Sequence, residues 1–115
     1  MRINETCIFQ VQPKMEKEFE AMVEEIKVFL TDYKGVCYYS FMKRTHSITD
    51  MDSIRNGDPP KTLTRIVKSI KYVMHLEVED ENSHGQVTKE FFEQFDKRIS
   101  KLLIMPADKL IGISI

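Results

Sequence analysis

The sequence predicts an α+β fold whose elements follow the order β-α-β-β-α-β, the ferredoxin-like arrangement. Three observations predict it. Apolar residues alternate with polar ones near both ends of the chain, they recur at spacings of three and four in two longer segments, and two more alternating segments lie between those helical segments. In chain order, the six segments are 3–11, 15–33, 36–44, 65–79, 87–103 and 109–115.

Each predicted helix has one apolar stripe suited to packing on a sheet. The first follows Pro13, which fits a first helical turn, and ends at Lys34-Gly35, where glycine tolerates a positive φ. The second begins near Asn82-Ser83, both good N-cap residues, and Pro106 stops it. The first stripe consists of Met15, Phe19, Met22, Ile26, Leu30 and Tyr33, and the second of Val87, Phe91, Phe95, Ile99 and Leu102 or Leu103.

The two central strands are apolar on both faces. In the second strand, one face carries Cys37, Tyr39 and Phe41, and the other carries Val36, Tyr38 and Met42. In the third strand, one face carries Ile66, Ile70, Tyr72, Met74, Leu76 and Val78, and the other carries Lys71, Val73, His75, Glu77 and Glu79. Two helices cover only one face of a four-stranded sheet, so we expect a homodimer that packs the second faces together.

Residues 45–62 predict an excursion between the central strands, outside an otherwise single domain that spans 1–115. The run Asn56-Gly57-Asp58-Pro59-Pro60 is dense in turn-forming residues. A segment of this length is usually functional or flexible, and we expect it to be mobile or draped on the partner subunit.

Composition argues against several classes of protein. The chain has 17 basic and 18 acidic residues, so it offers no field that attracts nucleic acid or an anionic membrane. Its longest apolar runs span only a few residues, too few to cross a bilayer, and no apolar segment follows Met1 as in a signal peptide. Cys7 and Cys37 are not in a CxxC motif and are expected to be buried thiols in a reducing cytoplasm, rather than a disulfide or a metal pair.

Three stretches resemble the antibiotic biosynthesis monooxygenase group of the dimeric α/β barrel superfamily. The run Ile8-Phe9-Gln10-Val11-Gln12-Pro13 before an acidic helix is similar to the first strand and helix of that group. Gly35-Val36-Cys37-Tyr38-Tyr39 resembles its second strand, and residues 73–80 with Phe91-Phe92-Glu93-Gln94-Phe95 resemble its third strand and second helix. The resemblance covers the chain outside 45–62. It implies a dimeric α/β barrel and oxygen chemistry that needs no cofactor, because the group includes cofactor-independent quinol oxygenases as well as haem-degrading enzymes.

The chain also departs from that group. A Glu-x-Trp strand motif is matched at Glu77, but Glu79 holds the Trp position and the chain has no Trp. The helix position where members often carry a His falls near Thr88. Haem-degrading members use an Asn, a Trp and a His, and two of these three have no match, which argues against haem degradation.

His75 and Glu77 are the predicted catalytic residues. His75 lies in a central strand beside a carboxylate, and an imidazole there can take a proton from a phenol or hydroquinone. The competing interpretation is a histidine satisfied by a cross-strand partner. His84 is expected at the start of the second helix, either at a pocket mouth or exposed, and His46 in the excursion. The three histidines lack ligand spacing, so no metal site is predicted.

An aromatic-walled pocket is the other candidate site. The predicted substrate-binding residues are Tyr38, Tyr39, Phe41, His84, Phe91 and Phe95, which suit a flat, apolar ring. The aromatic residues among them equally suit a filled core. The leading hypothesis is a cofactor-independent, monooxygenase-like oxidoreductase acting on a small aromatic or quinol-like molecule, and the alternative is a non-catalytic binding or sensing dimer of the same fold. An RNA-recognition module is disfavoured because the net charge and signature do not fit.

Overall fold

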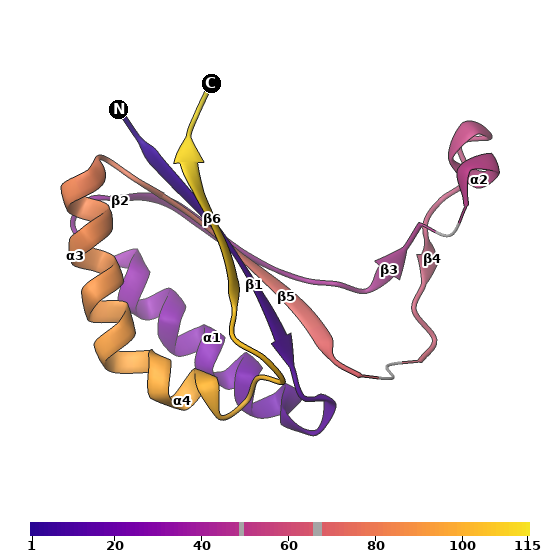
Figure 1. Ribbon diagram of the computed structural model, residues 1–115, viewed down its shortest axis with the longest axis horizontal. Coiled ribbons are helices and arrows are strands. Elements are labelled where there is room, and N and C mark those ends of the chain that lie inside the picture. The colour runs from indigo at the N-terminus through magenta and orange to yellow at the C-terminus, as the bar shows by residue number, and fades with distance from the viewer. Residues whose placement is uncertain (49, 66–67) are drawn as a thin grey trace.

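The computed structural model describes residues 1–48, 50–65 and 68–115 (Figure 1). Its centre is a four-stranded antiparallel sheet with the strand order β2-β5-β1-β6. The strands are β1 (Ile3–Val11), β2 (Val36–Lys43), β5 (Ile70–Val78) and β6 (Asp108–Ile113). The helical segments 16–31 and 81–100 lie together on one side of this sheet (Figure 1). The structure therefore confirms the predicted ferredoxin-like α+β order.

The first helix, α1 (Glu16–Thr31), follows the short 3-10 turn η1 (Pro13–Met15). Its predicted stripe is confirmed between Phe19 and Leu30, which are buried against the sheet. Gly35 comes before β2 with φ +98°. A Cβ at this glycine would lie 2.8 Å from Ser83 Oγ, so both the backbone conformation and the contact with the second helical segment require glycine.

The second helical segment joins α3 (Glu81–Phe91), a π-helical turn η2 (Phe92–Asp96) and α4 (Lys97–Ser100). Its N-cap is Asp80, whose carboxylate accepts a 2.7 Å hydrogen bond from the Ser83 backbone N–H, so the predicted start at Asn82-Ser83 was slightly late. The π-helical turn was not predicted. No helix in the described ranges is both long and apolar enough to cross a membrane.

Strand β2 contains a β-bulge that corrects two predictions. Val36 pairs with Val78, but the next pair is Tyr38 with Glu77, so one extra residue enters β2. Val36 consequently packs on the core side with Tyr39 and Phe41. Cys37, predicted to be buried on that face, is exposed instead.

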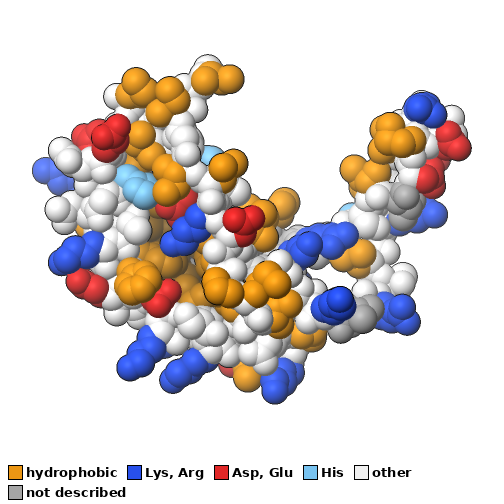
Figure 2. Space-filling model, in the orientation of Figure 1, with side chains coloured by type: hydrophobic (Ala, Val, Ile, Leu, Met, Phe, Trp, Pro, Cys, Tyr) orange, Lys and Arg blue, Asp and Glu red, His pale blue; other side chains and the backbone are white. Residues whose placement is uncertain are grey.

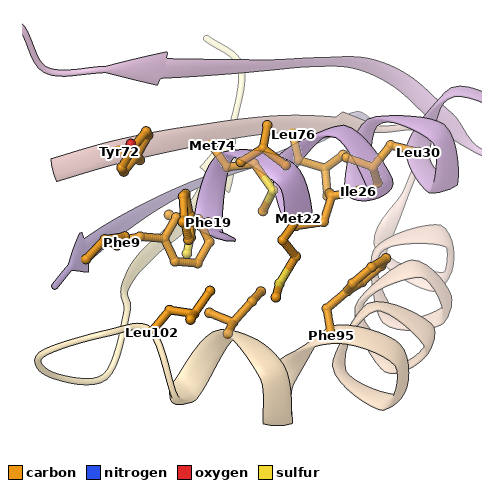
Figure 3. Close-up of a cluster of buried hydrophobic side chains, with 14 of the residues drawn as sticks. Phe9, Phe19, Met22, Ile26, Leu30, Tyr72, Met74, Leu76, Phe95 and Leu102 are labelled. Carbon is orange, nitrogen blue, oxygen red and sulfur yellow. The ribbon is translucent and has the colours of Figure 1, made fainter. Parts of the chain in front are cut away.

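The core lies between the sheet and the helices (Figure 3). The inward rows of β1 and β5 meet the apolar stripe of α1, with the Phe19 ring 4.6 Å from Tyr72 and 5.4 Å from Phe9 between centroids. Cys7 lies fully buried in the β1 row, and this burial raises the pKa of its thiol to about 12. Cys7 therefore acts as a small apolar side chain, as predicted, and both cysteines are free.

The opposite face of the sheet, which we call the open face, has no helix over it. Its apolar side chains are Ile8, Tyr38, Met42, Val73 and Leu110. Tyr38, Met42 and Leu110 are more than half exposed, and Leu110 is 76% exposed. The prediction of a second apolar sheet face is thus confirmed for the described residues, although Val36 belongs to the core side.

The predicted excursion forms an arm that projects away from the sheet (Figure 1). We define the arm as β3 (His46–Ser47), α2 (Met51–Arg55) and β4 (Lys61–Thr62), with β3 and β4 paired antiparallel. Apolar side chains at Ile48, Met51 and Ile54 are exposed on it. The predicted start of the third strand at 65 was early, because β5 begins at Ile70; residues 66 and 67 lie outside the described residues.

We predict that the body of the protein folds without the tip of the arm. Replacing residues 48–59 by a short Gly-Ser bridge removes no side chain of the described core. Thermal unfolding followed by circular dichroism is expected to remain a single cooperative transition. Loss of that transition in the deletion variant would show that the arm belongs to the folding unit.

Candidate functional site

Glu5 is a carboxylate in the buried row of β1. This row otherwise consists of Ile3, Cys7, Phe9 and Val11, and Glu5 is only 4% exposed. Within the described parts of the chain, it is the one charged residue in the buried class. A carboxylate removed from water in this way needs a hydrogen-bonding or charged partner.

His84 supplies that partner from the first turn of α3. Its Nε2 lies 2.7 Å from Glu5 Oε1, and the exposed fractions of the two side chains are 16% and 5%. Thr88, one helical turn later, places its Oγ1 3.5 Å from the same nitrogen. Nδ1 of His84 makes no hydrogen bond within the described ranges.

Two adjoining cavities lie between the sheet and the second helical segment; Glu5 lines the smaller one, and His84 lines neither. The smaller, of about 10 Å³, is lined by Glu5 and Thr88 together with apolar residues of α1 and β5. The larger, of about 420 Å³, has a mixed lining, with apolar residues such as Phe9 and Leu103 and polar residues that include Asp96 of η2. Phe91 and Lys109 line both cavities, so they mark the boundary between them. In Figure 2, hydrophobic side chains gather in the hollow between β6 and the helices.

His75 and Glu77 lie on the other side of the sheet from these cavities. His75 Nδ1 is 3.3 Å from Thr6 Oγ1, and its ring centroid is 6.2 Å from that of Tyr38. Glu77 pairs with Arg2 at 3.6 Å. The structure therefore puts the predicted catalytic residues on the open face, where the sheet separates them from the interior cavities.

The predicted substrate-binding residues do not gather in one pocket. Phe91 lines both cavities, and His84 adjoins the smaller one through Glu5 and Thr88. Tyr39 is hydrogen-bonded to α1, with its hydroxyl 2.6 Å from Thr31 Oγ1. Phe41 packs at the edge of the Tyr39 ring, Tyr38 is on the open face, and Phe95 is buried in the core.

Sequence reasoning missed Glu5, Thr88 and Lys109 as site residues. A signal for Glu5 was present, because it interrupts the alternating apolar row Ile3, Cys7, Phe9 and Val11. A carboxylate in such a row is expected to be buried, and buried carboxylates are rare without a partner. Among the described residues, no group of three or more potential ligands could hold a metal ion.

Comparison with known proteins identifies the fold. No known protein-family model matches the chain, and no curated protein sequence does. Rv0793 from Mycobacterium tuberculosis matches 100% of this chain and 96% of its own length, with a TM-score of 0.73 at 9% identity. SnoaB, a cofactor-independent oxygenase from Streptomyces nogalater, matches 98% and 92%, with a TM-score of 0.63 at 13% identity.

A structure named antibiotic biosynthesis monooxygenase matches 98% of both chains, with a TM-score of 0.69 at 10% identity. These likenesses confirm the fold that the sequence resemblance implied, namely that of the antibiotic biosynthesis monooxygenase structures. At such identities they establish the fold alone.

We predict that Glu5 and His84 are energetically coupled. His84→Leu leaves the Glu5 carboxylate buried without its partner, and the free energy of unfolding should fall by about 1–3 kcal/mol. The double variant Glu5→Leu with His84→Leu should be more stable than His84→Leu alone, because no polar group is then stranded. Urea unfolding of the wild type, both single variants and the double variant measures the coupling.

His46→Leu on the exposed arm is the matched control, with an expected change within about 0.5 kcal/mol. Additive effects of the two substitutions at Glu5 and His84 would contradict the pairing.

Proposed function

We propose that this chain is a cofactor-independent, monooxygenase-like oxidoreductase that acts on a small aromatic or quinol-like molecule in the interior cavities. The observation that carries the proposal is the buried Glu5–His84 pair: Glu5 lines the smaller cavity, which meets the larger one at Phe91 and Lys109. The fold, shared with SnoaB, is a further support, since SnoaB is a cofactor-independent oxygenase.

In this proposal the Glu5–His84 pair is the proton acceptor. Glu5 orients the imidazole through Nε2, and Nδ1 takes a proton from a substrate hydroxyl. The deprotonated ring is electron-rich and reduces O₂ directly. One oxygen atom forms a bond to a ring carbon, and the other leaves as water with two hydrogens of the substrate, so a hydroquinone and O₂ give a hydroxyquinone and water.

The larger cavity suits such a substrate in size and character. Its volume of about 420 Å³ lies within the range of small-molecule sites. Apolar residues such as Phe9, Phe91 and Leu103 line it and would contact the ring of the substrate.

We predict that His84→Asn lowers oxygen consumption with a reactive hydroquinone by about a hundredfold, the usual scale for loss of a general base. The assay measures dissolved oxygen with a panel of hydroquinones, after subtraction of their uncatalysed oxidation. His75→Asn is the matched control, because His75 lies on the open face and its change should have little effect.

The opposite pattern, a loss with His75→Asn and none with His84→Asn, would favour the base predicted from sequence. Ligand binding without oxygen consumption by the wild type would overturn the enzymatic proposal and favour a binding or sensing dimer.

We also propose that two copies pack through the open face. Tyr38, Met42 and Leu110 expose apolar surface there, and a second copy can bury it through a two-fold axis. Met74 and Tyr39 are on the core side, so substitutions at these positions would not test this interface.

We predict that Met42→Glu or Leu110→Glu produces monomers or aggregates, because a carboxylate would be buried at the interface without a partner. Size-exclusion chromatography with light scattering measures the mass. Val28→Glu is the matched control, since Val28 is an exposed apolar residue on α1, away from the open face. A stable wild-type monomer at micromolar concentration would contradict the proposal.

A further inference from the structure

Lys109 occupies an unusual place at the boundary of the two interior cavities. It belongs to β6 and pairs in register with Cys7 of β1, so it lies in a row that faces the helices. It is exposed at the edge of the layer, yet it lines both the larger cavity and the smaller one. Among the residues lining these two cavities, it is the only lysine or arginine.

The ammonium group of Lys109 has no dedicated partner. Within the described ranges, Lys109 makes no hydrogen bond through its side chain and no ion pair. Three charged residues affect the neighbouring thiol of Cys7: Lys109 lowers its pKa, while Glu5 and Asp108 raise it. The Glu5 carboxylate is already bonded to His84, so it is not a partner reserved for the lysine.

We propose that Lys109 binds an anionic oxygen of an aromatic ligand in the interior cavities. This inference rests on the proposed function and specifies its substrate class as aromatic molecules bearing a carboxylate or a phenolate. The ring of the ligand lies in the apolar cavity beside Phe91, and the anionic oxygen accepts a charge-assisted hydrogen bond from the ammonium group. The ligand's charge thereby stays at the exposed edge rather than in the apolar interior.

Acidic groups near Lys109 disfavour the binding of an anion, whereas Lys109 favours it. Glu5 of β1 and Asp96 of η2 line the cavities and act against an anion, His84 of α3 is hydrogen-bonded to Glu5, and Asp108 of β6 lies on the open face in register with Ile8. Removal of the Lys109 charge should therefore reverse the preference of the site. A neutral ligand should then bind more tightly than the anionic ligand with the same ring.

The first arm of the test compares 2-naphthoate with 2-naphthamide, which have the same ring system but differ in charge. Isothermal titration calorimetry should show tighter binding of 2-naphthoate to the wild type. Lys109→Gln should weaken 2-naphthoate binding by about tenfold and change 2-naphthamide binding by less than about twofold. Lys109→Arg should restore most of the preference, and Lys101→Gln, at an exposed lysine outside both cavities, should behave as the wild type.

The second arm tests a phenolate with 4-nitrophenol, whose ionised form is followed by its visible absorption. A nearby cation favours the anionic form, so the pKa of the bound phenol should be lower in the wild type than in Lys109→Gln. A shift in this arm without a preference in the first identifies the ligand class as phenolates, and the reverse pattern identifies carboxylates.

Equal weakening of acid and amide by Lys109→Gln with no pKa shift in the second arm, no effect in either arm, or no binding of any probe to the wild type would overturn the proposal. Neither arm depends on turnover. A wild type that prefers 2-naphthoate but consumes no oxygen with hydroquinones would support the role of Lys109 in binding and overturn the proposed oxidation.

Discussion

Two helices can cover only one face of a four-stranded sheet, and the other features of this protein follow from that constraint. The covered face holds the core, the Glu5–His84 pair and the interior cavities. The open face is left with exposed apolar side chains such as Met42 and Leu110. One sheet thus presents two surfaces: we propose that a ligand binds on the inner surface and that a second copy of the chain packs on the outer surface.

Glu5 makes the inner surface more than a packing layer. An apolar residue at this position would complete the row of β1 without any need for His84. The carboxylate instead requires a polar partner, and α3 begins close enough for His84 to reach it in its first turn. Gly35 permits the close contact between the loop before β2 and Ser83 of the same turn, so the local chain geometry supports the placement of the histidine.

Periodicity predicted the order of the elements because each strand and helix has a regular row of apolar residues. It could not predict the bulge at Val36. One extra residue in β2 moves Val36 to the other face of the sheet, while the apolar composition of the strand gives no sign of the change. Periodicity also led to a different candidate base from the one proposed here. His75 and Glu77 are two residues apart in one strand and so share a face, whereas Glu5 and His84 are 79 positions apart and meet only through the fold. A pair that meets only through the fold cannot be found from short spacing in sequence.

The most direct test of the central claim, that the functional site lies inside the helix-covered layer, is an NMR titration of the histidine rings with 2-naphthamide. Each of the three imidazoles gives its own nitrogen and proton signals, assigned with single histidine substitutions. Ligand binding in the interior cavities should shift the His84 signals and leave those of His75 and His46 in place. Shifts at His75 with none at His84 would place the site on the open face and contradict this account.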